Sequence, residues 1–314
     1  MQNRSFEISN YISSKLGREK FNVFEYCSKE YGKDLAKRII EKTGPLNLYH
    51  CSESEDTLTL AIEAFKKINN KIPLDDIKNL IFVSETNVYQ FPGNGFLFAS
   101  KVGMNENISV YDLNAGCTGF VDALILAEKL DYNSLIVCSE AYSKNIESFD
   151  RSVSTLFSDC STIFFYDKKI FKVCENFSFI KKDTYDDLQK KHGKSMFMNG
   201  SKIFSFVSSL VSKKLIEFIN LHKQNYDFKA LYLHQASALV LDYFKSKKEL
   251  TNLSIPLNLD KIGNTVSSSI PMLILDDKEN INKHFSDIIL CGFGVGLACS
   301  GVILKINKWE KFFY

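Results

Sequence analysis

Short runs of β-branched and aromatic residues alternate along this chain with longer stretches whose apolar residues recur at helical spacing. Alternation of this kind predicts an α/β fold built in layers, because each helix must bury its apolar stripe against a sheet. The predicted strands cover residues 80–84, 108–112, 134–139, 162–166, 230–233, 287–291 and 302–306. The predicted helices cover residues 57–67, 117–130, 202–221, 236–247 and 268–275.

The length of 314 residues is comfortable for two domains and allows a sizeable core without metals or disulfides. No linker rich in Gly, Ser or Pro divides the chain, and the loosest segment is the polar stretch 181–194. No sequence repeat is strong enough to indicate an internal duplication by itself.

Composition and charge narrow the classes of function. A net charge of +2 without a long Lys/Arg run does not predict a nucleic-acid partner. No stretch approaches the roughly 18 apolar residues of a membrane-spanning helix, and residues 1–10 carry no apolar signal region. We therefore expect a cytoplasmic protein with no membrane partner. The eight cysteines form no C-x-x-C pair and fit no common zinc spacing, so we expect no metal.

One cysteine stands apart from the others, which lie mostly in apolar runs typical of buried positions. Cys117 follows a predicted strand, sits in the small-residue turn 114–119 and is placed at the predicted start of a helix. Unpaired N–H groups and the helix dipole favour a thiolate there, which makes the sulfur a better nucleophile. A buried cysteine at a tight strand–helix turn is the alternative interpretation.

Three further segments place candidate groups after predicted strands or turns. His234 ends the strand 230–233, at the edge where open α/β sheets carry their sites. Asn264 lies in a Gly-Asn turn before a helix, where plain capping is the alternative. The glycines at 292, 294 and 296 lack the spacing of a dinucleotide loop, so a turn that aims backbone N–H groups at an oxyanion is the better interpretation.

Together these segments resemble the β-ketoacyl-acyl-carrier-protein synthase III family of the thiolase superfamily. The matching words are Asn-Ala-Gly-Cys-Thr-Gly-Phe at 114–120, His-Gln-Ala-Ser at 234–237, Gly-Asn-Thr at 263–265 and Gly-Phe-Gly-Val-Gly at 292–296. The resemblance runs in consistent order from about residue 43 to the C-terminus. It implies a five-layered αβαβα fold of two similar halves, 1–167 with the nucleophilic cysteine and 168–314 with the histidine and asparagine, and a homodimer.

The resemblance also implies a reaction. Cys117 would take an acyl group from a thioester donor, with the N–H groups of Cys117 and Val295 as the oxyanion hole. A malonyl thioester on acyl carrier protein would then lose CO₂, and His234 and Asn264 would hydrogen-bond the developing enolate without adding negative charge. The carbanion would attack the acyl-cysteine to give a β-ketoacyl product. No cofactor is implied, since acyl-CoA or acyl carrier protein enters as substrate.

The resemblance implies further contacts with substrate and carrier. The substrate-binding residues would be Phe91, Arg151, Gly200, Ser201, Phe204 and Ser237. Phe204 would shield the site, and Phe91 would wall the acyl pocket, of its own or the partner subunit. Lys245, Lys247 and Lys248 would meet an acidic carrier protein, with a solvated helix face as the alternative.

The chain departs from the family pattern where many members bind coenzyme A. Arg38 and Lys42 precede Thr43-Gly44, where an aromatic residue and an arginine are frequent. A donor other than acetyl-CoA is therefore open. Separately, Leu239 falls where a basic residue often helps to dock the carrier protein.

Three other functions are alternatives. Asn264 argues against acyl transfer to an oxygen or nitrogen acceptor without decarboxylation, because such relatives often have a carboxylate there. Peptide hydrolysis has the same Cys-His-Asn order, but the sequence around Cys117 does not fit it, and the intact three residues argue against acyl binding without catalysis.

Overall fold

The computed structural model describes residues 6–146, 150, 153–284 and 286–308 and contains two main β-sheets. The first has the order β1-β7-β6-β4-β5, with β1 (Ile12–Leu16), β4 (Ile77–Val83), β5 (Ser109–Leu113), β6 (Asn133–Glu140) and β7 (Cys160–Tyr166). The second has the order β11-β12-β13-β8, with β8 (Phe171–Ile180), β11 (Phe228–Leu233), β12 (Asp287–Gly294) and β13 (Ala298–Ile306).

The two sheets share one pattern of strand directions, which no sequence repeat had indicated. In the first, β4 runs parallel to β5 and β6, while β7 and β1 are antiparallel to their neighbours. In the second, β11 runs parallel to β12, while β13 and β8 are antiparallel. A single parallel bridge between Ala230 of β11 and Ser254 lies at one edge of the second sheet. This edge corresponds to the one that β5 occupies in the first sheet. The chain boundary at 167/168 stays a prediction, although the strands of the two sheets lie on either side of it.

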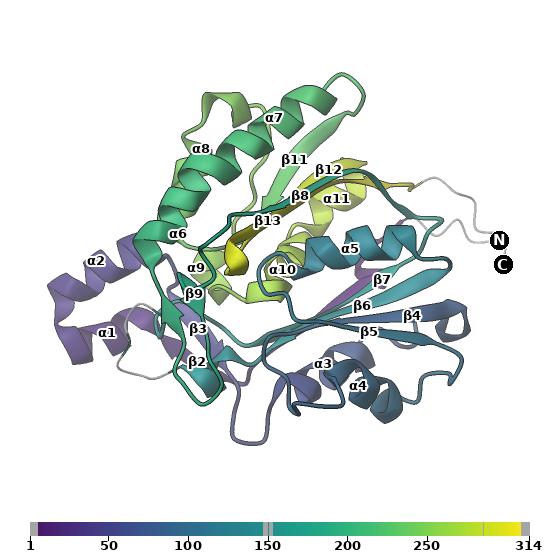
Figure 1. Ribbon diagram of the computed structural model, residues 1–314, viewed down its shortest axis with the longest axis horizontal. Helices are drawn as coiled ribbons and strands as arrows, with labels where there is room; N and C mark the ends of the chain where they lie inside the picture. Colours follow the sequence, from purple (N-terminus) through teal and green to yellow (C-terminus); the bar gives the residue numbers. More distant parts are fainter. Residues whose placement is uncertain (1–5, 147–149, 151–152, 285, 309–314) are drawn as a thin grey trace.

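Helices separate and cover the sheets in five layers (Figure 1). The layer between the sheets contains α5 (Gly119–Lys129) and α10 (Ser269–Asp276). The outer face of the first sheet is covered by α3 (Thr57–Lys66) and α4 (Asn94–Val102), and that of the second by α6 (Gly200–Phe206), α7 (Ser212–His222) and α8 (Ala238–Lys245). The predicted helix 202–221 is thus α6 and α7 joined by one π-helical turn, Val207–Val211.

The central strands are apolar on both faces, because helices cover both. In β4, Ile81 and Val83 point to the core between the sheets, whereas Leu80 and Phe82 point to the core under α3 and α4. In β12, Ile288 and Leu290 face the central layer, and Ile289 and Cys291 face the layer of α7 and α8. Burial on both faces explains why these strands were predictable as short continuous apolar runs.

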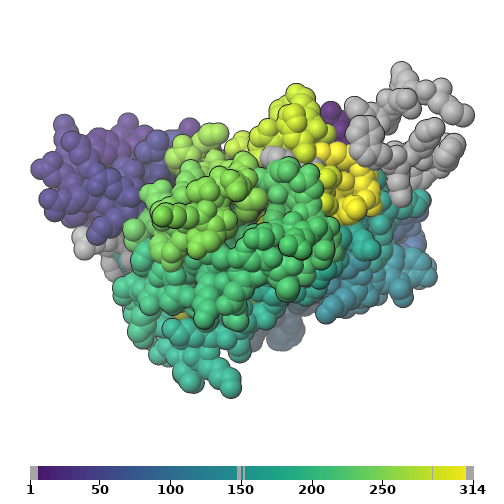
Figure 2. Space-filling view, turned by 90° about the horizontal axis from the view of Figure 1, so that it is seen from above, coloured from purple at the N-terminus to yellow at the C-terminus, as the bar shows by residue number. Residues whose placement is uncertain are grey.

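The remaining elements lie at the ends of the layers. α1 (Val23–Tyr31) and α2 (Lys33–Thr43) project at one end of the molecule beside the hairpin of β2 (Glu19–Asn22) and β3 (Asn47–His50), and Figure 2 shows them as a separate protrusion. The other elements are β9 (Leu188–Gln189), β10 (Phe197–Met198), α9 (Leu259–Ile262) and α11 (Lys278–Lys283). Among the described residues, no helix is long and apolar enough to cross a membrane.

Candidate active site

Cys117 lies in the turn that follows β5, at the carboxyl end of the parallel strands of the first sheet. The helix was predicted to begin at residue 117, but α5 begins at Gly119 with Thr118 as its N-cap residue. Cys117 therefore precedes the helix by two residues, and its side chain is only 9% exposed. The turn buries the sulfur under the second sheet instead of presenting it to solvent.

The backbone at the end of β12 packs against this cysteine. A Cβ atom on Gly294 would come within 2.7 Å of Cys117 Sγ, and one on Gly292 would come within 2.6 Å of the Cys117 carbonyl oxygen. Only glycine permits this approach, because any side chain there would displace the nucleophile. As a result, the backbone N–H of Val295, the next residue, hydrogen-bonds to the Cys117 sulfur.

His234 follows β11 directly and is 2% exposed. Its backbone N–H donates to the Cys291 carbonyl at 3.0 Å. Its imidazole ring contacts the Phe293 ring edge-on, at a centroid distance of 5.7 Å. Because Phe293 lies between the two glycines that contact Cys117, the imidazole is held in the same small region as the sulfur. Its Nδ1 has no hydrogen-bond partner among the described residues.

Asn264 reaches the same region from the loop after α9 and is 3% exposed. Its side-chain amide donates to the Ala236 carbonyl at 3.3 Å, two residues after His234. Its side-chain oxygen accepts the Val266 N–H at 2.9 Å. Backbone hydrogen bonds with Leu156 and Ser158 fix the residue from the other side. The structure therefore brings the three predicted groups together from separate parts of the chain.

The protonation states differ from the sequence-based expectation for the cysteine. Burial raises the pKa of the Cys117 thiol, and the nearby Glu85 carboxylate raises it further, against the opposing hydrogen bond from Val295. The predicted resting thiolate is therefore wrong, because desolvation of the buried sulfur outweighs the hydrogen bond from Val295. Burial also lowers the pKa of the His234 imidazole to about 3. At neutral pH the site combines a protonated sulfur with a neutral imidazole.

The neutral imidazole predicts a specific pH dependence of stability. The unfolded chain binds a proton at His234 below about pH 6.5, whereas the folded chain does so only near pH 3, so stability falls as the pH falls through this window. Between pH 6.5 and pH 4.5, we expect the free energy of unfolding of His234→Gln to fall by about 2 kcal/mol less than that of the wild type, as measured by urea unfolding. Equal losses in both proteins would contradict a buried neutral imidazole.

The other predicted contact residues are placed less uniformly. Phe204 packs against the apolar cluster that includes Cys117, and its ring meets Tyr243 edge-on at 5.8 Å. Ser237 is the N-cap residue of α8 and accepts the Val240 N–H at 3.4 Å. Gly200 begins α6, where the Ser201 hydroxyl donates to Asn199. These positions do not test contact with a substrate, so each of the four predicted substrate contacts stays a prediction.

The remaining predicted residues lie at the surface or outside the described part of the chain. Phe91 is 80% exposed in the single chain and does not reach its own site. Lys245 and Lys248 are exposed, and the Lys247 ammonium lies 4.0 Å from the centroid of the Tyr243 ring. Arg151 lies outside the described residues. The predicted contacts of Phe91, Arg151 and the three lysines therefore stay predictions.

Three polar residues of the site were missed by the sequence analysis. Glu85 follows β4, Glu140 ends β6, and Tyr142 lies two residues further on. The signal was present, since Glu85 directly follows the predicted strand 80–84 at the same sheet edge as Cys117. Carboxyl ends of parallel strands meet at one edge, so a charged residue there was a candidate.

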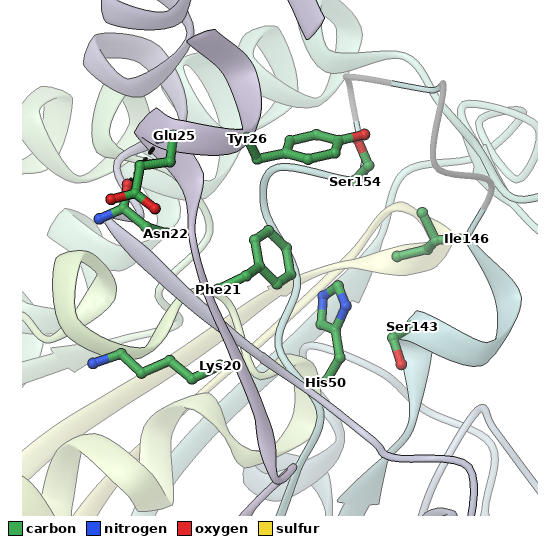
Figure 3. Close-up of a pocket in the computed structure, with 9 residues that line it drawn as sticks. All are labelled: Lys20, Phe21, Asn22, Glu25, Tyr26, His50, Ser143, Ile146 and Ser154. Atoms are coloured by element: carbon green, nitrogen blue, oxygen red, sulfur yellow. Dashed lines mark hydrogen bonds between the residues drawn. The ribbon is translucent and has the colours of Figure 1, made fainter. Parts of the chain in front are cut away.

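A separate pocket of about 560 Å³ lies beside the site, between the β2–β3 hairpin, α1 and the segment after β6. Figure 3 shows the His50 and Phe21 rings next to one another in it, and they pack edge to face with a centroid distance of 4.6 Å. His50 Nε2 lies 3.3 Å from the Phe157 carbonyl, and Phe157 pairs with Asn264 on its other side. Cys117 does not line this pocket, so it is distinct from the site built above.

Comparison with solved structures defines the class of fold. A crystal structure of 3-oxoacyl-(acyl-carrier-protein) synthase III superposes with a TM-score of 0.84 at 21% identity, covering 96% of this chain and all of that chain. The synthase III of Thermus thermophilus gives 0.83 at 22% identity, covering 95% and 98%. The fold is therefore the thiolase-like αβαβα fold of the condensing enzymes, as predicted.

Sequence comparison narrows the class to one family. Two family models match, 3-oxoacyl-[acyl-carrier-protein (ACP)] synthase III over residues 111–168 and its C-terminal counterpart over residues 220–306. The β-ketoacyl-[acyl-carrier-protein] synthase III of Streptococcus agalactiae is 30% identical over 294 residues, covering 85% of this chain and 90% of the relative. That of Clostridium perfringens is 28% identical over 287 residues, covering 82% and 87%. The chain belongs to the β-ketoacyl-acyl-carrier-protein synthase III family and is a condensing enzyme of the transferase class.

Proposed function

We propose that this enzyme catalyses the decarboxylative Claisen condensation of an acyl thioester with a malonyl group on acyl carrier protein, through an acyl-Cys117 intermediate. The convergence of Cys117, His234 and Asn264 from both sheets is the observation that carries this proposal. A thiol beside two neutral hydrogen-bonding side chains fits a reaction that passes through an acyl-cysteine and then an enolate.

The proposed steps assign each group a role. The Val295 and Cys117 N–H groups stabilise the oxyanion that forms as the sulfur attacks the donor carbonyl. His234, kept neutral by burial, and the Asn264 amide then donate to the enolate oxygen that forms as CO₂ leaves. Neither adds a negative charge that would oppose the enolate. The carbanion attacks the acyl-cysteine, and the sulfur departs from the β-ketoacyl product.

The proposal extends to the partner protein. Lys245 at the end of α8, with Lys247 and Lys248 just beyond it, would give a basic surface for an acidic acyl carrier protein. The roles of Gly200, Ser201, Phe204 and Ser237 in substrate binding are part of the same proposal. We expect the protein to act in the cytoplasm.

The proposal also includes a homodimer. The exposed apolar residues Tyr89, Phe91 and Phe96 lie in one segment, next to the edge strand β5. Asp112 of β5 accepts the Gly95 N–H at 2.8 Å and holds this segment at the sheet edge. An open edge strand beside apolar side chains favours pairing with a second copy. In such a dimer, Phe91 would reach the partner subunit.

A panel of donors tests the reaction. The enzyme is incubated with acetyl-CoA, longer acyl-CoAs and acyl carrier protein loaded with the same acyl groups, and the mass added to the Cys117 peptide is measured. We expect acyl mass on Cys117 without malonyl carrier protein, and one CO₂ released per β-ketoacyl product once it is added. Transfer of the acyl group to a hydroxyl or amine acceptor without CO₂ release would favour the non-decarboxylating reaction instead.

A further inference from the structure

Two carboxyl groups lie next to the nucleophile without a role in the reaction as proposed. Glu140 is fully buried at the end of β6. Four donors surround its carboxyl group, with distances of 2.9 Å from the Thr86 hydroxyl, 3.0 Å from the Ser267 hydroxyl, 3.1 Å from the Glu85 N–H and 3.4 Å from the Ser84 hydroxyl. This group is enclosed by the protein and is a structural neighbour of the site.

Glu85 is placed differently, because its side chain is only partly buried and lies against the cysteine turn. The Tyr142 hydroxyl and the Gly116 N–H both donate to its carboxylate. A Cβ atom on Gly116 would come within 2.4 Å of Glu85 Oε2, so the carboxylate lies across the backbone of the residue that precedes Cys117. Tyr142 and Cys117 belong to the same buried cluster, so the three side chains border the same region.

The two carboxyl groups differ in their tendency to ionise. Burial raises the pKa of both, but it raises that of Glu140 well above its ordinary range, and the Glu85 charge adds to this. The hydrogen bonds from Tyr142 and Gly116 counteract the effect on the pKa of Glu85. Because two adjacent carboxylates raise each other's pKa, the pair favours a single negative charge over two, and the hydrogen bonds from Tyr142 and Gly116 stabilise that charge when it is on Glu85.

Acyl transfer to Cys117 requires an acceptor for the thiol proton, since the resting sulfur is protonated. A proton on His234 would create a cation in a buried apolar region, which the low pKa of that imidazole opposes. A proton that moves from the thiol to a carboxylate creates no new charge, because one anion replaces another. The nearby carboxylate that disfavours a resting thiolate is therefore well suited to receive its proton.

We propose that the Glu85 carboxylate, held by the Tyr142 hydroxyl and the Gly116 amide, accepts the proton of the Cys117 thiol during acyl transfer. The inference rests on the proposed role of Cys117 as acyl acceptor. The S–H bond breaks as the sulfur bonds to the donor carbonyl carbon and Glu85 takes the proton, directly or through one water. The carbon–sulfur bond of the donor then breaks, and the departing thiolate takes the proton back from Glu85.

The experiment measures single-turnover acylation of Cys117 against pH in the absence of malonyl carrier protein. In the wild type, acylation should slow as the pH falls through the pKa of Glu85, where Glu140, Tyr142 and Cys117 are the titratable groups that face it. Glu85→Gln preserves the size and the acceptor oxygen but removes the base. We expect it to acylate about 10²-fold more slowly and to lose the acidic limb of the profile.

Two further variants complete the test. Tyr142→Phe removes one hydrogen bond to the carboxylate and should shift the acidic limb to higher pH, while Glu63→Gln, at a partly exposed position paired with Lys66, should leave the profile unchanged. If Glu85→Gln acylates at the wild-type rate with the wild-type pH profile, or if the acidic limb of Tyr142→Phe is not shifted, Glu85 is not the proton acceptor. The proposed function would then still stand. A wild-type protein that takes up no acyl group at Cys117 would overturn the proposed function and this inference with it.

Discussion

Replacing Cys117 by serine is expected to abolish acyl uptake and to lower the rate of condensation by at least about 10⁴-fold. Serine is slightly smaller than cysteine, so the tight contact with Gly294 is kept and the fold should be unaffected. The hydroxyl is a far weaker nucleophile than a thiol at neutral pH. Burial and the neighbouring carboxylates, which already raise the pKa of the thiol, oppose ionisation of a hydroxyl even more.

Mass spectrometry of the acylated protein and steady-state formation of β-ketoacyl product give the two readouts. Cys174→Ser is the matched control, because Cys174 is a partly exposed free cysteine in β8, away from the site. The control should behave as the wild type. Acyl mass retained in Cys117→Ser, or lost in Cys174→Ser, would show that the nucleophile has been assigned to the wrong residue.

Replacing Asn264 by aspartate is expected to lower CO₂ release from malonyl carrier protein by about 10²–10³-fold while acylation of Cys117 continues. Aspartate can still accept the Val266 N–H, so the local hydrogen bond at 2.9 Å is preserved. It loses the amide N–H groups and places a negative charge where the enolate develops. The separation of the two half-reactions distinguishes an effect on the enolate from general damage to the site.

The two half-reactions are measured separately, acylation by protein mass and decarboxylation by release of labelled CO₂. Asn22→Asp is the matched control, because Asn22 is the N-cap residue of α1 and aspartate caps a helix equally well. Unchanged decarboxylation in Asn264→Asp would remove the amide from the proposed mechanism.

Most strands that the sequence predicted are buried on both faces, whereas the predicted edge strand β5 is not. The structure confirms four of them, β4, β6, β11 and β12, which are short continuous apolar runs in the sequence. β1 and β8 were missed because each lies at a sheet edge and carries polar residues on one face, as in the alternating burial of Phe171–Ile180. α1 and α2 were missed because each buries only one or two residues.

The sequence by itself determined the layered fold, the family and the choice of Cys117, His234 and Asn264 as candidate residues. Each of these depends on short motifs and apolar runs that can be recognised in the sequence without the three-dimensional structure. Only the tertiary structure decided the protonation of the site. The pKa of a side chain depends on desolvation and on charges from distant segments. The second sheet buries Cys117, and Glu85 and Tyr142 approach it from other strands. The resulting site holds a neutral imidazole, a protonated thiol and a neighbouring carboxylate.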